Sequence, residues 1–330
     1  MGMTVVIAYE KFGASLVERD VLTPIGAHVV KIGDLGSSEG RAAVREADAL
    51  MVTTQAVPAE LLREMRRCRI VSRVGTGVDA IDVAAATASG IWVTYVPDYA
   101  VDEVSSHALA LVLAQARQLP RLIDSTRRGI WDYRQAPVPR RLKDQTLGVL
   151  GFGRIGRAMA AKGRGVGFAV IAHDPYVDAA EMTAVGVRPV DWKTLLGASD
   201  FLSLHVPLTE ETRRMVDARA LSQMKPTAFL VNTARGEVVD VDALLRAVRA
   251  GQIAGAGLDV LPVEPPGADH PILREERVIV TPHSAWSSVE SAIDVAVRGA
   301  EEVARVLCGE RPRSPANEVD GVRAGMGVNR

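Results

Sequence analysis

The fold of this chain is decided by one stretch near its middle, Leu147-Gly148-Val149-Leu150-Gly151-Phe152-Gly153-Arg154-Ile155-Gly156. The first four residues are typical of a buried strand, and a helical pattern follows at residues 157–162. A GxGxxG sequence between a strand and a helix is the pattern of a dinucleotide-binding turn. There, Gly151 permits a tight turn, Gly153 lets the backbone approach a pyrophosphate, and Gly156 lets the helix lie close to the strand. The helix N-terminus offers free N–H groups to the phosphates.

An acidic residue follows at the spacing that this turn requires. A second strand is predicted at Ala169–Ala172, and Asp174 comes 174 − 153 = 21 residues after Gly153, near the roughly 20 expected for a ribose-binding acid. A carboxylate accepts hydrogen bonds from ribose hydroxyls and repels a 2′-phosphate, so the sequence favours NAD over NADP. The alternative is that Asp174 only caps the turn made with Pro175.

Short β-branched runs alternate with helical patterns along the whole chain, which predicts βαβ units. The predicted fold class is α/β, with two Rossmann-like or flavodoxin-like domains built on doubly wound parallel sheets. Strands are expected in a first block at 4–8, 49–52, 70–73 and 91–94, and in a second at 147–150, 169–172, 201–204, 228–231, 256–259 and 278–280.

The segments around the second block carry their own signals. Residues 101–117 have the apolar spacing of a long, mostly buried helix, and residues 288–308 are expected to form the last long helix. The stretch 128–143 contains two closely spaced prolines and is expected to be an irregular, exposed arm. The tail from Arg311 is expected to be loosely held.

The composition limits the kinds of partner that the sequence predicts. Lys and Arg total 39 and Asp and Glu total 40, a net charge of −1, which gives no electrostatic case for nucleic acid or an anionic membrane. No stretch approaches the ~20 apolar residues of a membrane span. Cys68 and Cys308 are far apart and have no metal-ligand spacing, so we expect no metal site, no disulfide scaffold and a cytoplasmic location.

Three polar residues follow predicted strands of the second block. Arg235 comes after 228–231, Glu264 lies in a Pro-rich loop after 256–259, and His283 ends the strand at 278–280. An open α/β sheet binds its ligands at the carboxyl ends of the strands, so these side chains should meet there. Each alone has an ordinary interpretation: a surface arginine, an exposed loop acid and a structural histidine.

Together the three residues supply what reduction of a ketone needs. A guanidinium can hold a substrate carboxylate in a bidentate manner. A histidine can donate a proton to the carbonyl oxygen, and a carboxylate beside it fixes the tautomer and stabilises the imidazolium. With a nicotinamide held by the GxGxxG turn, Arg235, Glu264 and His283 are the predicted catalytic residues.

The order of several motifs resembles the D-isomer-specific 2-hydroxyacid dehydrogenase family over nearly the whole chain. These motifs are RVGTGVD at 73–79, GFGRIG at 151–156, LHVPLT at 204–209, VNTARGEVVD at 231–240, GAGLDVLPVEP at 255–265 and TPHSAW at 281–286. The resemblance implies an NAD-dependent enzyme that reduces a 2-oxo acid to a D-2-hydroxy acid and catalyses the reverse reaction. Glyoxylate, hydroxypyruvate, 3-phosphoglycerate and branched or aromatic 2-oxo acids are all compatible with this reaction, so the sequence does not identify the substrate.

The resemblance also implies a split domain arrangement. Residues 1–98 and 287–330 would form the substrate-binding domain, and residues 99–286 would form an inserted NAD-binding Rossmann domain. Members of the family usually form homodimers through their NAD domains, and the arm at 128–143 would then embrace a second copy.

Further site residues come from the same motif matches. Cofactor contacts are implied for Gly151, Gly153, Arg154, Ile155, Gly156, Asp174, His205, Val206, Pro207, Thr209, Thr233, Ala234 and Asp259, the last toward the nicotinamide carboxamide. Substrate contacts are implied for Arg73, Val74, Gly75, Thr76, Gly77 and Trp286. The loop from Val74 to Gly77 would present backbone N–H groups to the carboxylate, as anion-binding nests do.

Within the family the sequence is most similar to the C-terminal-binding-protein-like subgroup, through Arg73, the HDPY sequence at 173–176 and Trp286. Trp286 is expected either to wall the substrate pocket or to lie in the core. His107 is given no role beyond packing or hinge contacts. An alternative function is an NAD(H)-sensing, corepressor-like interaction protein, and the Arg–Glu–His set favours the enzyme.

Overall fold

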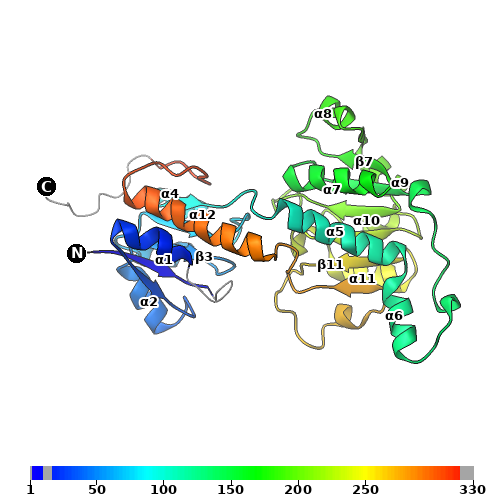
Figure 1. Ribbon diagram of the computed structural model, residues 1–330, viewed down its shortest axis with the longest axis horizontal. Helices are drawn as coiled ribbons and strands as arrows, with labels where there is room; N and C mark the ends of the chain where they lie inside the picture. Colours follow the sequence, from blue (N-terminus) through cyan, green and yellow to red (C-terminus); the bar gives the residue numbers. More distant parts are fainter. Residues whose placement is uncertain (1, 10–16, 320–330) are drawn as a thin grey trace. The chain divides into compact units, whose positions relative to one another are not determined.

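The computed structural model describes residues 2–9 and 17–319, which divide into two compact units (Figure 1). Unit 1 is Met1–Tyr99 with Ser288–Arg330, and unit 2 is Ala100–Ser287. The breaks predicted from the sequence were after residues 98 and 286. Met1 and residues 320–330, assigned above to the substrate-binding domain, lie outside the described residues, and the functional roles of the two units stay predictions.

Unit 1 is built on a five-stranded, all-parallel sheet with the strand order β2-β1-β3-β4-β5. Its strands are β1 (Met3–Ile7), β2 (Ala27–Lys31), β3 (Ala49–Val52), β4 (Ile70–Arg73) and β5 (Trp92–Thr94). This order is the flavodoxin-like variant of the doubly wound fold. The edge strand β2 was not predicted, because the exposed His28 and Lys31 interrupt its apolar residues.

Helices cover both faces of this sheet, as a parallel sheet requires. They are α1 (Val17–Leu22), α2 (Ser38–Arg45), α3 (Ala59–Glu64), α4 (Val83–Ala88) and α12 (Val289–Leu307). Successive β1 residues alternate between two cores: Val5 and Ile7 contact the α1 and α12 side, whereas Val6 faces the α2, α3 and α4 side. Because α12 belongs to this core, the two separated stretches of unit 1 form one body.

The prediction that the tail is loosely held from Arg311 onward is wrong for residues 311–319. Pro315 forms a β-bridge with Thr94, and the Asn317 side chain accepts a hydrogen bond from the Val93 amide at 2.7 Å and donates one to the Ile91 carbonyl at 3.0 Å. Residues 315 and 317, in a stretch whose composition suggests a free tail, thus bond to backbone groups at the open edge of β5.

Unit 2 is built on a seven-stranded, all-parallel sheet with the order β12-β11-β10-β9-β6-β7-β8. Its strands are β6 (Thr146–Leu150), β7 (Ala169–His173), β8 (Arg188–Pro189), β9 (Phe201–Leu204), β10 (Phe229–Asn232), β11 (Gly255–Leu258) and β12 (Val278–Val280). The order reverses at β6, as in a Rossmann sheet. The predicted α/β fold class is confirmed, although six strands were expected and the two-residue β8 was missed.

The helices of unit 2 also lie in two layers (Figure 1). They are α5 (Val101–Ala116), α6 (Leu119–Arg127), α7 (Arg154–Gly165), α8 (Ala179–Ala184), α9 (Trp192–Ala198), α10 (Ala218–Ser222) and α11 (Val241–Arg249). Helices α5 and α7 contact one face of the sheet, where Leu147 and Val149 are buried. Helices α9, α10 and α11 cover the other face, where Leu202 and Leu230 are buried.

The segment between α5 and β6 differs in part from the prediction. An additional helix, α6, precedes the arm, because Pro120 falls in the first turn, where a missing N–H costs nothing. The arm itself, residues 128–143, is irregular apart from short 3-10 turns at Tyr133–Gln135 and Leu142–Asp144. Among the described residues, no helix is both long enough and apolar enough to cross a bilayer.

Candidate active site

The glycine-rich turn has the geometry that the sequence predicted for it. Gly151 has φ +85°, and a side chain on Gly156 would meet the Gly151 carbonyl at 2.0 Å. Gly153 is the N-cap of α7, which therefore begins at Arg154 rather than at residue 157. A Cβ placed on Gly153 would meet nothing within 4 Å, so the space above the turn is open. Ile155 and Gly156 continue the first helical turn, and the free N–H groups of a helix N-terminus suit phosphates.

Asp174 fastens this turn to the neighbouring strand. One carboxylate oxygen accepts a hydrogen bond from the Phe152 amide at 2.7 Å, and the other accepts one from the Tyr176 amide at 2.9 Å. The acid stands just after β7, beside the point where the strand order reverses. Both expected roles are thus compatible: Asp174 caps its own turn and stands where a ribose would lie.

The loop after β9 forms the other wall of the turn. A side chain on Gly151 would meet the His205 carbonyl at 2.7 Å and the Val206 side chain at 3.0 Å. The His205 ring contacts the Ser203 hydroxyl at 2.9 Å, and burial lowers the pKa of His205 to about 4, so this imidazole is neutral at pH 7. Pro207 and Thr209 follow in an exposed loop that the Thr212 side chain closes.

A buried hydroxyl after β10 has no hydrogen-bond partner. Thr233 is 8% exposed, and its Oγ1 is among the few buried side-chain atoms of the described residues that make no hydrogen bond. The Ala234 amide beside it is tied to the Asn232 side chain at 3.0 Å. An orphaned hydroxyl, an open turn and a carboxylate at the strand-order reversal together fit a dinucleotide.

Arg235 is placed by the glycine that follows it. The side-chain amide of Asn232 donates to the Arg235 carbonyl at 2.8 Å, and the Arg235 guanidinium donates to the Ala234 carbonyl at 2.8 Å. A side chain on Gly236 would meet the Leu261 carbonyl carbon at 2.0 Å. Only glycine therefore lets the loop after β10 lie directly against the loop that carries Glu264.

Glu264 and His283 form a close pair. Nδ1 of His283 lies 2.6 Å from Oε2 of Glu264, and Oε1 of Glu264 accepts the Leu261 amide at 2.8 Å. Desolvation opposes ionisation of Glu264, but these hydrogen bonds and the positive charge of His283 and Arg235 outweigh it and lower the pKa of the carboxyl. Arg235 contributes to this lowering, so its charge lies near the pair.

The backbone at His283 is held in an uncommon conformation. Its φ is +52°, in the left-handed region that non-glycine residues rarely adopt. The His283 amide donates to the Asp259 carbonyl at 2.8 Å, and the Asp259 carboxylate accepts the amides of Ser284 and Ala285, each at 2.9 Å. Asp259 is 2% exposed. Its carboxylate thus holds the catalytic loop in place, and its expected contact with the nicotinamide carboxamide stays a prediction.

One neighbour of this loop was not predicted from the sequence. His107, on α5, has its Nε2 3.0 Å from Oγ1 of Thr281 and 3.6 Å from Oδ1 of Asp259. The available signal was positional: His107 stands on the helix face that contacts β11, one turn before the buried Leu111.

An apolar cavity of about 340 Å³ adjoins the pair. It is lined by Asp259, Leu261, Glu264, Pro265, Pro266, Leu273, Val280, Thr281, Pro282 and His283. Two of the lining residues, Asp259 and Glu264, are acids, so the cavity suits an uncharged group rather than a phosphate. Trp286 is partly buried in unit 2, three residues beyond His283.

The predicted anion loop lies in unit 1 at the end of β4. The amides of Val74 and Gly75 are already bonded, to the carbonyls of Val52 and Arg73, whereas those of Thr76 and Gly77 have no acceptor among the described residues. Gly75 has φ +148°, and a side chain there would overlap the Arg73 guanidinium. The free donors of the loop are therefore fewer than expected.

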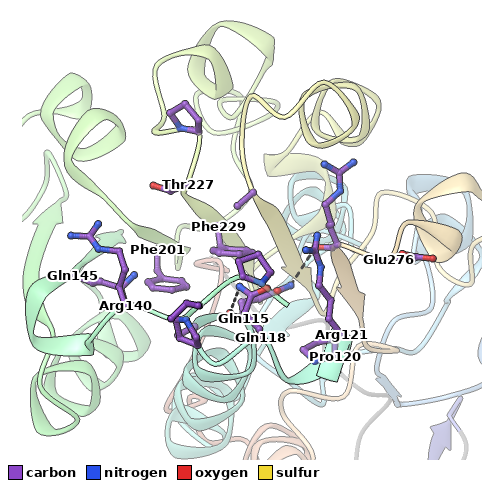
Figure 2. Close-up of a pocket in the computed structure, with 17 residues that line it drawn as sticks. Gln115, Gln118, Pro120, Arg121, Arg140, Gln145, Phe201, Thr227, Phe229 and Glu276 are labelled. Atoms are coloured by element: carbon purple, nitrogen blue, oxygen red, sulfur yellow. Dashed lines mark hydrogen bonds between the residues drawn. The ribbon is translucent and has the colours of Figure 1, made fainter. Parts of the chain in front are cut away.

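A second cavity, of about 250 Å³, lies at the opposite edge of the unit 2 sheet (Figure 2). Phe201 and Phe229, at the amino-terminal ends of β9 and β10, line it with parallel rings 5.6 Å apart. Residues of α5, α6 and the arm form its other walls, with Arg121 and Arg140 among them. Nothing predicted for the reaction lies at this edge.

Comparison with known proteins places this geometry in a family. Residues 109–285 match the model of the D-isomer specific 2-hydroxyacid dehydrogenase NAD-binding domain. The chain is 41% identical over 281 residues to D-3-phosphoglycerate dehydrogenase of Mycobacterium leprae, which covers 85% of this chain and 53% of that protein. It is 39% identical over 279 residues to glyoxylate reductase of Korarchaeum cryptofilum. This match covers 83% of this chain and 84% of that protein.

A solved structure agrees with these matches. D-lactate dehydrogenase of Aquifex aeolicus, complexed with NAD and lactic acid, superposes with a TM-score of 0.84 at 28% identity and covers 93% of this chain and 96% of that one. The chain spans about half the length of the phosphoglycerate dehydrogenases that it matches. The C-terminal-binding-protein-like subgroup stays a prediction. The chain belongs to the D-isomer specific 2-hydroxyacid dehydrogenase family, whose NAD-binding domain matches residues 109–285.

Proposed function

We propose that this protein catalyses the NAD-dependent reduction of a 2-oxo acid to a D-2-hydroxy acid, and the reverse oxidation. The observation that carries the proposal is the hydrogen-bonded pair of Glu264 and His283 beside Arg235, at the carboxyl edge of an NAD-binding sheet. Catalytic groups of open α/β sheets stand at this edge.

The bound nicotinamide supplies the hydride, and the residues of this chain do the rest. Nδ1 of His283 is engaged by Glu264, which leaves Nε2 to give a proton to the substrate oxygen. The ionised Glu264 fixes that tautomer and stabilises the imidazolium. Arg235 holds the substrate carboxylate and polarises the carbonyl.

We also propose that the loop from Val74 to Gly77 in unit 1 contacts a substrate carboxylate. The amides of Thr76 and Gly77, which have no acceptor in the part of the chain that the structure describes, suit a carboxylate, and the guanidinium of Arg73 provides a nearby positive charge. The Arg73 side chain also donates to the Val74 carbonyl at 2.6 Å, so its position is fixed within the unit. Trp286 is proposed as an apolar wall of the substrate pocket.

The relatives named above act on different acids, and the proposal is confined to their common chemistry. The test is NADH oxidation by the purified protein across a panel of 2-oxo acids: glyoxylate, hydroxypyruvate, its 3-phosphate, pyruvate, and branched and aromatic members. Saturable turnover of at least one of them is expected. Tight NADH binding without turnover of any of them would contradict the enzyme and favour the NAD(H)-sensing alternative.

We also propose that the protein is a homodimer formed through unit 2. The arm exposes Trp131, Tyr133 and Val138, which are 93%, 76% and 80% accessible in the isolated chain. Apolar side chains gathered on one segment mark an interaction surface. Light scattering after size exclusion should give twice the mass of the 35.2 kDa chain, and Trp131→Ser with Tyr133→Ser should lower it.

A further inference from the structure

Helix α5 lies along β11 in a fixed register. His107, Leu111 and Gln115 are four residues apart and so share one helix face. Gln115 donates to the Ala256 carbonyl at 3.0 Å, and a side chain on Gly257 would meet the Leu111 Cβ at 3.1 Å. This register carries His107 past the carboxyl end of β11, to the loop that holds Asp259.

The hydrogen bonds at this point determine which ring nitrogen of His107 carries a proton. Oγ1 of Thr281 lies 2.6 Å from Oδ1 of Asp259 and 3.0 Å from Nε2 of His107. Both carboxylate oxygens accept backbone amides, so the Asp259 side chain acts as an acceptor and the single Thr281 proton points toward it. The threonine oxygen must then accept a hydrogen bond from His107, whose Nε2 is therefore protonated.

This chain of hydrogen bonds leads directly to the catalytic backbone. Asp259 holds the amides of Ser284 and Ala285, and its carbonyl accepts the amide of His283. The left-handed conformation of His283 is unfavourable by itself and persists only where the surroundings hold it. An anchor on α5 thus supports the loop from the side of the sheet.

We propose that His107 is a positioning residue for the reaction, acting through Thr281 and Asp259 on the loop that presents His283. The inference rests on the proposed function. His107 does not touch the reacting atoms; its Nε2–H keeps the Thr281 hydroxyl directed at Asp259, and its ring places a proton donor 3.6 Å from that buried carboxylate. Apolar packing alone would need neither donor.

The test compares a variant that keeps the donor with one that removes it. His107→Gln retains an N–H near Nε2, whereas His107→Leu fills similar space without one. A shift of the catalytic group by about 1 Å can cost about 10²-fold, so kcat of His107→Leu should fall about 10- to 100-fold with little change in KM for NADH. His107→Gln should recover most of that loss. Equal kcat in His107→Leu and the wild type would overturn the proposal, as would equal losses in both variants.

Thr281→Val removes the hydroxyl that connects His107 to Asp259 and provides a second variant. It should lower kcat as His107→Leu does, and the double variant should be no worse than either single one, because coupled residues are not additive. Additive losses would show two independent effects and would contradict the hydrogen-bond connection from His107 through Thr281 to Asp259. His28, exposed on β2 in unit 1, offers a matched control as His28→Leu, which should keep wild-type kcat.

The protonation state can be read without any turnover. The chain has six histidines, so nitrogen-15 imidazole spectra of the wild-type protein are tractable, and the signal lost in His107→Gln identifies His107. An Nε2–H tautomer is expected, and an Nδ1–H tautomer would refute the hydrogen-bond chain. If the wild type reduced no 2-oxo acid, the proposed function would fail separately. The tautomer of His107 would still decide whether the hydrogen bonds from His107 through Thr281 to Asp259 exist.

Discussion

The imidazole of His283 and the carboxylate of Glu264 form one hydrogen-bonded unit, with Nδ1 and Oε2 2.6 Å apart. This contact fixes the direction in which the ring can act. Because Nδ1 donates to the carboxylate, Nε2 is the nitrogen available to a substrate oxygen. Proton transfer, substrate anchoring and cofactor choice can therefore be tested one residue at a time.

Replacing His283 by alanine removes the proton donor. A positioned acid contributes about 10²- to 10⁴-fold to the rate, so kcat for reduction of the best 2-oxo acid should fall by a factor in that range. NADH binding, followed by fluorescence titration, should stay close to that of the wild type. Near-normal turnover by His283→Ala would show that another group donates the proton.

Replacing Glu264 by glutamine should change the pH profile. The folded pKa of Glu264 is lowered, so its negative charge is present above the ordinary value of 4.5 and is lost only as the pH falls through the depressed value. The carboxylate is therefore ionised throughout a neutral assay range. In Glu264→Gln the imidazolium has no counter-charge, and the alkaline limb of kcat for reduction should move to lower pH. An unmoved limb would separate Glu264 from the proton donor.

Replacing Arg235 by alanine should affect kcat/KM most strongly. The guanidinium is predicted to hold the substrate carboxylate in ground and transition states alike, and loss of a charged partner of this kind costs roughly 2–5 kcal/mol. Arg235→Lys should recover only part of it, because an ammonium lacks the planar pair of donors. Arg219→Ala, on the exposed face of α10, is the matched control and should leave kcat/KM unchanged.

Much of this site could be predicted because its chemistry is local in sequence. The GxGxxG turn, Asp174 at the next strand end, and the polar residues after β10, β11 and β12 each follow a strand by a few residues. Parallel strands carry such residues to the same edge, so a correct fold class brings them together. To place these residues at that edge, the predicted ends of the strands needed to be correct only within a residue or two.

The features that were missed depend on contacts distant in sequence. Gly236 reads as an ordinary turn glycine until its contact with Leu261 is seen. His107 lies 174 residues from Thr281, and nothing near it in the sequence indicates that partner. Helix α6, with Pro120 in its first turn, was not predicted either.

Cofactor preference should depend on the charge of Asp174. Asp174→Asn removes the charge, and its amide oxygen can still accept the Phe152 amide. Repulsion of the 2′-phosphate should then fall, so the ratio of the Kd for NADPH to the Kd for NADH should decrease, by about 10-fold for each 1.4 kcal/mol removed. Asp217→Asn, at the N-cap of α10, should leave the ratio unchanged. If the wild type bound NADPH as tightly as NADH, the ribose role of Asp174 would be lost.

Gly236 should prove necessary for bringing Arg235 to Glu264. A methyl group there would meet the Leu261 backbone at 2.0 Å, and backbone cannot rotate away as a flexible side chain can, so Gly236→Ala must push the two loops apart. Overpacking of this kind costs about 1–3 kcal/mol, which should lower the Tm. It should also lower kcat/KM for the 2-oxo acid more than it weakens NADH binding, because the displaced loops carry the catalytic pair and the carboxylate anchor. Gly165→Ala is the matched control, since a Cβ there meets nothing within 4 Å, and it should lower neither Tm nor kcat/KM. A Gly236→Ala protein with unchanged kcat/KM would show that the two loops tolerate separation and that Arg235 and Glu264 act independently.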